Sequence, residues 1–209
     1  MPFWEQAISM LREAMFGYAQ LTQGSLGTGI LVVTFVARAL LLPLAVKLGV
    51  AAARHQPAMS RLKPELDALR ERHQNNPQAL HTAMQGLFAR EGVSMFPLST
   101  LVGSLAQLPL LIALFSAVQQ VAARGGAFLW IRDLARPDVG VAVVATGLTI
   151  GGALIAPQSP ADQRWAMVLM PAPVTAITLT QMASGVGLYW GASSAVGIVQ
   201  AVLVARRRA

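Results

Sequence analysis

The residue with the clearest chemical potential is Arg38, near the middle of a long apolar stretch at residues 27–50. About 20 apolar helical residues cross a hydrocarbon core of about 30 Å, so this stretch predicts a membrane-spanning helix. A guanidinium at that depth costs about 2.5 to 3.5 kcal/mol on lenient insertion scales, and it is usually retained where it faces water, a counter-charge or a substrate. Lys47, at the polar boundary, is about 13 Å away along the helix, which exceeds the comfortable reach of the Arg38 side chain. We therefore expect Arg38 to have a function.

Other polar side chains are sparse in the apolar stretches. Thr34 lies one turn before Arg38 on the same helix face, and Gln107 and Gln181 carry amides that lipid cannot satisfy. The remaining polar residues of interest are Thr146, Thr149, Thr175, Thr178, Trp190, Ser193, Ser194 and Gln200. If such side chains converge on Arg38, they line a wet cavity that suits an anionic guest. Alternatively, the Thr and Ser hydroxyls bond carbonyls of their own helices and permit close packing.

The sequence lacks the patterns of common catalytic and cofactor sites. It has no cysteine, and His55, His73 and His81 lack the spacing and carboxylate partners of a zinc site. It also has no GxSxG elbow, no phosphate-binding glycine loop and no acidic residue within an apolar stretch. We therefore expect no enzyme, no cofactor and no metal. The net charge of +7 comes without a recognisable nucleic-acid-binding module, so we expect no direct nucleic-acid recognition.

Composition places these residues in a polytopic membrane protein. Of the 209 residues, 55% are hydrophobic and 12% are charged, and the charged fraction is about half that of soluble domains. We predict an all-α membrane protein with five transmembrane helices. The expected spans are residues 27–50, 95–121, 139–156, 165–183 and 187–205. The predicted organisation is an interfacial amphipathic helix at 1–23, the first span at 24–50, a helical hairpin at 51–94, spans two to five at 95–205 and a basic tail at 206–209.

The hairpin is predicted from a polar stretch that holds most of the charges. The turn signal Asn75-Asn76-Pro77 separates two helical pieces, at residues 59–74 and 78–90, and each piece carries an apolar stripe. If the hairpin, the loop after residue 156 and the C-terminus share one side of the membrane, that side holds eleven of the sixteen basic residues. The positive-inside rule then makes these segments cytoplasmic and places the N-terminus outside.

Five stretches, in order, are similar to the YidC/Oxa/Alb family of membrane protein insertases. They are VTFVARALLLPLAVK in the first span, MSRLKPELDALRERH in the hairpin, GVSMFPLSTLVGSLAQLPLLIALF at the second span, FLWIRDLARPD in the next loop and GVGLYWGASSAVGIVQ in the last span. Each match is loose by itself, but five in the right order over nearly the whole chain are specific. The chain resembles a bacterial, minimal form of the family without a large outer domain.

The resemblance implies insertion of newly made proteins into the bacterial plasma membrane through a hydrophilic groove. In this comparison Arg38 is similar to the family's groove arginine, and Thr34 to the polar residue one turn before it. Gln107 is similar to a glutamine before a proline, and Tyr189 and Trp190 to an aromatic pair that meets substrate. With Gln181 added for its amide, the expected groove residues are Arg38, Thr34, Gln107, Gln181, Tyr189 and Trp190.

The expected partners are nascent membrane proteins and the lipid bilayer, and the chain is expected to be a monomer. The Sec translocon and the ribosome are further candidates, although the basic tail ARRRA is short for ribosome docking. Two other functions remain open at this point. One is a small-anion transporter or channel subunit with Arg38 as its binding site, and the other is a structural subunit of a larger membrane complex.

Overall fold

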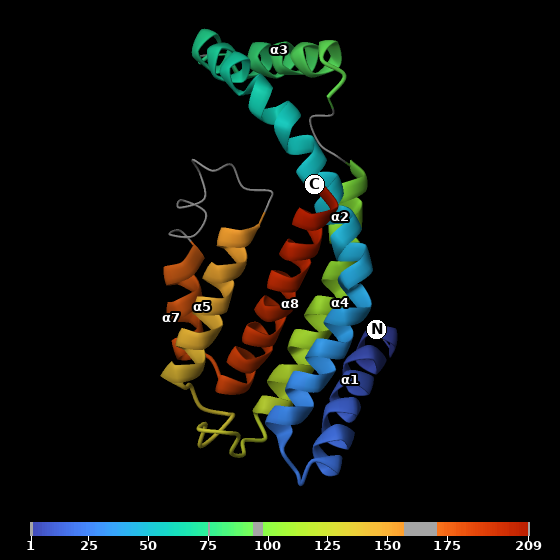
Figure 1. Cartoon of the computed structure of the whole chain (residues 1–209), viewed down its shortest axis with the longest axis vertical. Helices are drawn as coiled ribbons and strands as arrows, with labels where there is room; N and C mark the ends of the chain where they lie inside the picture. Colours follow the sequence, from blue (N-terminus) through green and yellow to red (C-terminus); the bar gives the residue numbers. More distant parts are fainter. Residues whose placement is uncertain (1, 75, 94–97, 157–170, 209) are drawn as a thin grey trace.

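The computed structural model describes residues 2–74, 76–93, 98–156 and 171–208 (Figure 1). Their helices are α1 (Pro2–Leu21), α2 (Leu26–Arg72), α3 (Pro77–Arg90), α4 (Leu98–Ala122), α5 (Val139–Ile155), α7 (Pro171–Gln181) and α8 (Ser184–Arg208). Within these ranges no strand forms, and the only β-type pairing is an isolated bridge between Phe128 and Ile131. The predicted all-helical class is confirmed. The loop after residue 156 and the start of the expected fourth span lie outside the described residues.

In the described part of the chain, two helices are long and apolar enough to cross a membrane. The first is Leu26–His55 within α2, with a mean hydropathy of 2.3, and the second is Ser184–Arg207 within α8, with a mean hydropathy of 1.6. Shorter apolar helical stretches occur at Gln107–Ala122 and Val139–Ile155. The chain is therefore a membrane protein built on at least two apolar spans.

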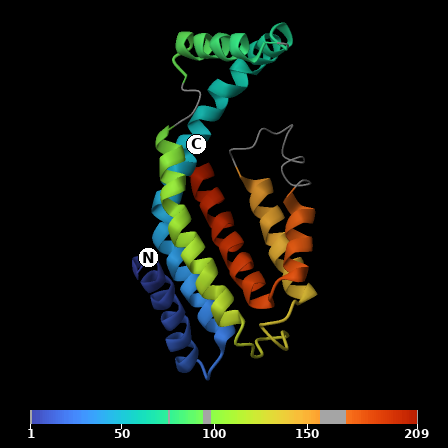
Figure 2. The ribbon, with the colours of Figure 1, turned by 180° about the vertical axis from the view of Figure 1, so that it is seen from behind.

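Helix α8 lies between two groups of helices, as the views from opposite sides show (Figures 1 and 2). It contacts α2 and α4 on one side and α5 and α7 on the other. In the described part of the chain, the backbone of α2 does not come close to that of α5, nor does that of α4 come close to that of α7, although Leu31 of α2 and Val141 of α5 belong to one apolar cluster. Between these two groups, two opposite faces of α8 have a helix on either side but no described helix directly in front of them.

Glycines allow this close packing around α8. A Cβ atom at Gly185 would lie 2.6 Å from the Cβ of Ala122 on α4, and one at Gly187 would lie 2.6 Å from the Val141 side chain on α5. Real Cβ atoms do not approach other atoms so closely. Any residue other than glycine at either position would therefore push the helices apart. The main apolar core forms beside them, where α1, α2, α4 and α8 bury Met15, Ile30, Leu114, Val118 and Val186.

Helix α1 packs lengthwise against α2 and α4 (Figures 1 and 2). Met15 is completely buried there, and its backbone carbonyl touches the position that a Cβ of Gly29 would occupy. Arg12 Nη1 also donates a hydrogen bond to Gln120 Oε1 on α4, at 3.0 Å. We expected residues 1–23 to lie in the membrane interface. In the structure their apolar face packs against the core formed by α2 and α4, and the interfacial position stays a prediction.

Helix α2 continues beyond the first span without a break and is 47 residues long. The expected separate helix beginning at residue 59 is therefore wrong. Pro43, Pro57 and Pro64 lie inside α2, and each removes a backbone donor without ending the helix. The Asn76 side chain accepts a hydrogen bond from the Ala79 amide at 3.0 Å and caps α3, as expected of a turn that ends in Pro77.

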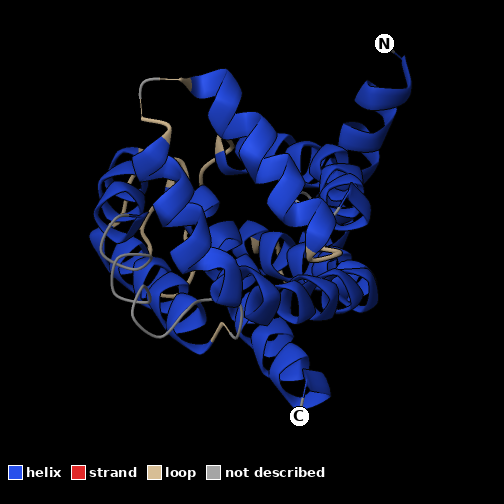
Figure 3. Cartoon of the chain, turned by 90° about the horizontal axis from the view of Figure 1, so that it is seen from above, coloured by secondary structure: helices blue, strands red, loops and turns tan. Residues whose placement is uncertain are grey.

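Helix α3 packs back against the end of α2 and lies across the bundle axis (Figures 1 and 3). Leu62 and Leu66 of α2 are buried against Leu87 and Phe88 of α3. An exposed ion pair between Arg90 Nη2 and Glu65 Oε2, at 2.9 Å, joins the same two helices. Exposed pairs contribute about 0 to 1 kcal/mol, so the apolar contacts are the main stabilising element.

The loop at 123–138 fixes the opposite end of the bundle. Asp138 accepts a hydrogen bond from the Val141 amide at 2.9 Å and caps α5. The first residues of α8 bond to the same loop, because the Ser184 amide donates to the Arg136 carbonyl and the Ser184 hydroxyl donates to the Asp133 carbonyl. This loop therefore holds the starts of α5 and α8 at one level.

Two matched glycine substitutions test the packing of α1. Gly29→Ala places a Cβ against the Met15 backbone, which cannot move away without shifting α1, and we expect a loss of about 1 to 3 kcal/mol of stability. Gly17→Ala on α1 meets nothing within 4 Å and should stabilise the helix by up to about 1 kcal/mol. The measurement is the thermal unfolding midpoint in detergent. Equal behaviour of the two variants would contradict the lengthwise packing.

Candidate functional site

Arg38 lies on α2 and points to α8. Its Nε donates a hydrogen bond to Ser193 Oγ at 3.1 Å in a partly buried position. Among the described residues, no carboxylate forms an ion pair with Arg38, and no other hydrogen bond reaches its guanidinium. A guanidinium has five N–H donors, so the four on its two terminal nitrogens remain available to water or to an anionic group.

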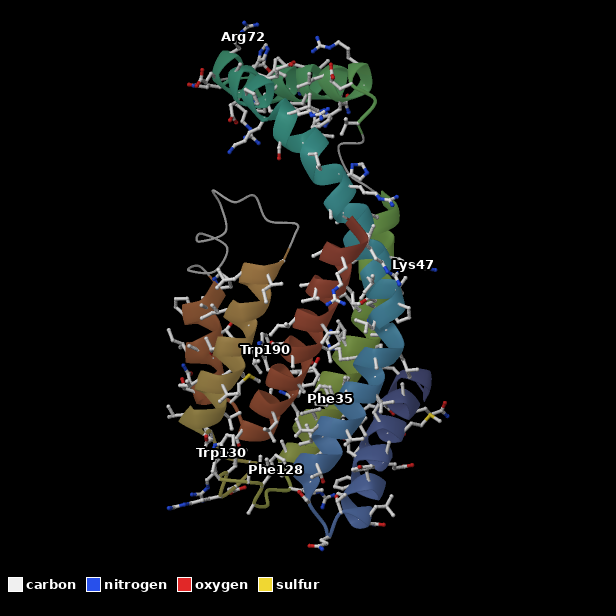
Figure 4. All side chains as sticks on the ribbon, viewed as in Figure 1. Phe35, Lys47, Arg72, Phe128, Trp130 and Trp190 are labelled. Atoms are coloured by element: carbon white, nitrogen blue, oxygen red, sulfur yellow. The ribbon has the colours of Figure 1, made fainter. Side chains whose placement is uncertain are left out.

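A second polar cluster joins α5 to α8. Trp190 Nε1 donates to Thr149 Oγ1 at 3.2 Å, and the Thr149 and Ser194 hydroxyls lie 2.9 Å apart. The Thr149 hydroxyl also donates to the Ala145 carbonyl at 2.9 Å. Because a hydroxyl has one proton and two lone pairs, Thr149 must accept from both Trp190 and Ser194. The Thr149 hydroxyl thus has its one donor and both acceptor positions engaged, and it holds the Trp190 indole between α5 and α8 (Figure 4).

A cavity of about 250 Å³ adjoins this cluster, between α5 and the half of α8 nearer the hairpin. Its lining includes Thr149, Ser194, Gln200, Gly152, Gly197 and Ala201. Gln200 Nε2 donates to the Ala45 carbonyl on α2 at 3.3 Å, which leaves its amide oxygen as an acceptor. A site with polar partners and room for several water molecules holds water, unlike an apolar cavity.

Thr34 and Tyr189 lie in the packed core. Thr34 is completely buried, and its hydroxyl donates to the Ile30 carbonyl of the same helix at 2.6 Å. Tyr189 is 6% exposed, and its ring lies against Phe115 of α4 with 6.2 Å between centroids. Thr34 thus bonds a carbonyl of its own helix, which is the alternative that the sequence analysis left open for hydroxyls in the spans. Tyr189 is surrounded by apolar side chains.

Gln107 and Gln181 take no part in the hydrogen bond between Arg38 and Ser193. Gln107 is half-buried on α4, and in the described part of the chain no hydrogen bond joins it to Arg38. Gln181 is the last residue of α7 and is exposed beside the turn into α8. Ser193 lies nine residues after the start of α8, about 13 Å along the helix. Of the expected residues, Arg38 and Trp190 are the two that form hydrogen bonds with described polar side chains of a neighbouring helix.

Ser193, Ser194 and Thr149 are among the polar residues of interest in the sequence, but they are not among the six expected groove residues. The spacing offered one signal, because Trp190, Ser193, Ser194, Gly197 and Gln200 recur at three or four positions and share one side of a helix. The sequence could not show that Arg38 and Thr149, which lie on other helices, meet this side. That information is tertiary.

Sequence comparison identifies the family to which the chain belongs. The sequence model of the 60Kd inner membrane protein family matches residues 17–209, nearly the whole chain. The chain belongs to the YidC family. A relative from Fusobacterium nucleatum named membrane protein insertase YidC is 30% identical over 190 residues, which cover 89% of each chain.

Other members of the YidC family differ in length. The membrane protein insertase MisCA of Bacillus subtilis is 30% identical over 214 residues, which cover 97% of this chain and 79% of that protein. A YidC from Agrobacterium fabrum is 26% identical, and the match covers 88% of this chain but 34% of that protein.

Thr149 and Thr146 allow the same substitution to be compared one turn apart. Thr149→Val leaves Trp190 and Ser194 without their partner, so we expect a loss of about 1 to 3 kcal/mol. The Thr146 hydroxyl is buried and has no hydrogen-bond partner among the described residues, so Thr146→Val should be neutral or stabilising. Thermal unfolding in detergent measures both effects. A larger loss for Thr146→Val would show that the Thr149 cluster does not join α5 to α8.

Proposed function

We propose that this chain is a non-enzymatic membrane protein insertase that receives substrate helices in a hydrophilic groove and releases them into lipid. The relatives named above are insertases, and the chain matches them over most of its length. The observation that carries the proposal is the guanidinium of Arg38, which is held by Ser193 and whose other four N–H donors have no partner among the described residues. Such a group within an apolar helix needs water or a polar guest.

The groove is proposed to lie along the side of α8 that carries Trp190, Ser193, Ser194 and Gln200. Arg38 would attract the polar or acidic outer segment of a substrate, and the low surrounding dielectric would strengthen that attraction. The cavity beside Thr149 and Ser194 would supply water to the hairpin side of the same path. Apolar substrate residues then enter lipid with a gain of about 25 cal/mol per Å² buried, which needs no nucleotide.

We further propose the five-span topology with the N-terminus outside and with the hairpin and the C-terminus in the cytoplasm. Arg54, Arg61 and Lys63 follow Lys47 along α2 as it runs to Arg72 in the hairpin (Figure 4), which supports this orientation. The proposed partners are nascent membrane proteins in a bacterial plasma membrane. The Sec translocon and the ribosome are candidates that copurification can test.

Replacing Arg38 tests the electrostatic step. Arg38→Ala should lower insertion of a single-span substrate with an acidic outer tail about tenfold or more, because a hydrogen bond to a charged group contributes about 1.5 to 3 kcal/mol. Arg38→Lys should retain part of the activity, because it keeps the charge. Lys47→Ala is the matched control, since Lys47 is an exposed cation on the same helix. Insertion is measured in vesicles depleted of the native insertase.

The same vesicles separate insertion from anion transport. Normal insertion by Arg38→Ala, together with Arg38-dependent flux of a small anion, would overturn the insertase proposal and favour the transporter. Loss of insertion without any anion flux in the native chain supports it.

Photocrosslinking tests the proposed side of α8. A photoreactive residue at position 190 or 194 should crosslink to an arrested nascent chain, because both positions border the polar cluster. Position 195 is the control, because it lies about 140° from position 190 and 100° from position 194 around α8. Stronger crosslinking at position 195 than at position 190 would place the substrate on the wrong side of α8 for this proposal.

A further inference from the structure

A second cavity, also of about 250 Å³, lies between α2, α5 and α8. Its lining includes Leu31, Phe35, Trp130, Val144, Leu148 and Ala195, and almost all of the exposed lining is apolar. Gly191 and Ala195 line this cavity, and each is two residues from Ser193, about 200° around the helix. The cavity therefore lies on the opposite face of α8 from the contact with Arg38.

The cavity opens toward lipid. Phe35 and Val144 at its walls are 43% and 51% exposed, and Val143 beside them is 66% exposed. Exposed apolar side chains on membrane-spanning helices contact acyl chains, and an apolar cavity does not hold water. Its lining runs from Val141 to Leu148 on α5, about 10 Å along the helix, which is roughly a third of a 30 Å hydrocarbon core. Its depth therefore corresponds to part of one leaflet.

The size of the cavity favours a thin occupant. An α-helix about 10 Å across occupies roughly 400 Å³ per 5.4 Å turn, which exceeds the cavity volume. A substrate or partner helix could place a side chain there but could not enter. An acyl chain is the occupant that the surroundings supply and that fits within these walls.

The end of the cavity at the 123–138 loop has the chemistry of a head-group site. Trp130 lines the cavity from this loop, below the end of α5 in Figure 4, and tryptophan favours the level of lipid head groups. Arg132 is exposed two residues later, and no ion pair to it occurs among the described residues. The acidic residues of the loop are engaged elsewhere, because Asp133 bonds the Ala135 amide and Arg136, and Asp138 caps α5.

We propose that this cavity binds one acyl chain of an anionic phospholipid from the leaflet on the side of the 123–138 loop. Trp130 and Arg132 hold the head group, and the walls formed by α2, α5 and α8 hold the chain. The site is separate from the proposed substrate groove, because α8 lies between them. The bound lipid fills the space that α2 and α5 leave open in front of α8.

The test uses the full chain in bilayer nanodiscs that contain a photoactivatable phospholipid with a diazirine in the acyl chain. The probe is made with a phosphatidylglycerol or a phosphatidylcholine head group. Labelling should concentrate on the peptides that carry Leu31, Phe35 and Val144, and it should exceed the labelling of Ile112, an exposed residue of α4 outside the cavity. Uniform labelling of all exposed apolar residues would overturn the proposal, because it would indicate ordinary bilayer contact only.

Two variants separate the chain site from the head-group site. Ala195→Leu fills the cavity and should lower labelling about tenfold, the effect of about two buried methylene groups. Val143→Leu, at an exposed neighbouring position that does not line the cavity, is its matched control. Arg132→Gln, on the exposed loop, should lower phosphatidylglycerol labelling about fivefold and leave phosphatidylcholine labelling unchanged.

The outcomes decide the occupant even where one variant folds poorly. If Ala195→Leu is unstable in detergent, the head-group preference of the native chain and its loss in Arg132→Gln carry the test alone. A photoreactive residue at position 144 that captures a nascent chain instead of lipid would overturn the proposal. Failure of the lipid labelling alone leaves the proposed function unaffected, because no insertion assay enters it. Capture of a nascent chain at position 144 would in addition contradict the proposed substrate side of α8.

Discussion

The packing of α8 against α2 and α5 is the constraint on which the rest of the structure depends. Lipid tails are as apolar as the helix surfaces, so helices in a membrane associate through close packing and buried hydrogen bonds. Gly185 and Gly187 permit the close packing, and the bonds of Thr149 and Arg38 to α8 supply the polar part. Because the backbones of α2 and α5 stay apart, a cavity remains on each of two opposite faces of α8.

These two faces of one helix have opposite chemistry. One carries Trp190, Ser193 and Ser194, whose polar atoms are held by Thr149 and Arg38. The other carries Gly191 and Ala195 in an apolar cavity. A helix repeats every 3.6 residues, so adjacent residues such as Ser194 and Ala195 can serve different surroundings. A polar path for substrate and an apolar site for lipid are therefore compatible on a single helix.

The continuity of α2 gives the hairpin a direct mechanical connection to Arg38. The same helix carries Arg38 in its apolar part and Leu62 and Leu66 in the hairpin. A helix interior transmits displacement through its backbone hydrogen bonds, although prolines such as Pro57 remove some of them and allow bending. If the proposed function holds, contact of a substrate with the hairpin is connected to Arg38 through one continuous helix.

The sequence by itself determined the all-helical class, the apolar stretches around Arg38 and in α8, and the cap and turn before α3, because these depend on local periodicity and on single residues such as Asn76 and Pro77. It also singled out Arg38, since a charge within an apolar stretch is visible without a fold. Only the tertiary structure decided that Arg38 meets Ser193, that Thr34 is buried and that α1 packs lengthwise on α2. The physical reason is that each of these outcomes depends on which neighbouring helix faces the residue, and helical periodicity fixes a direction but not the partner in that direction.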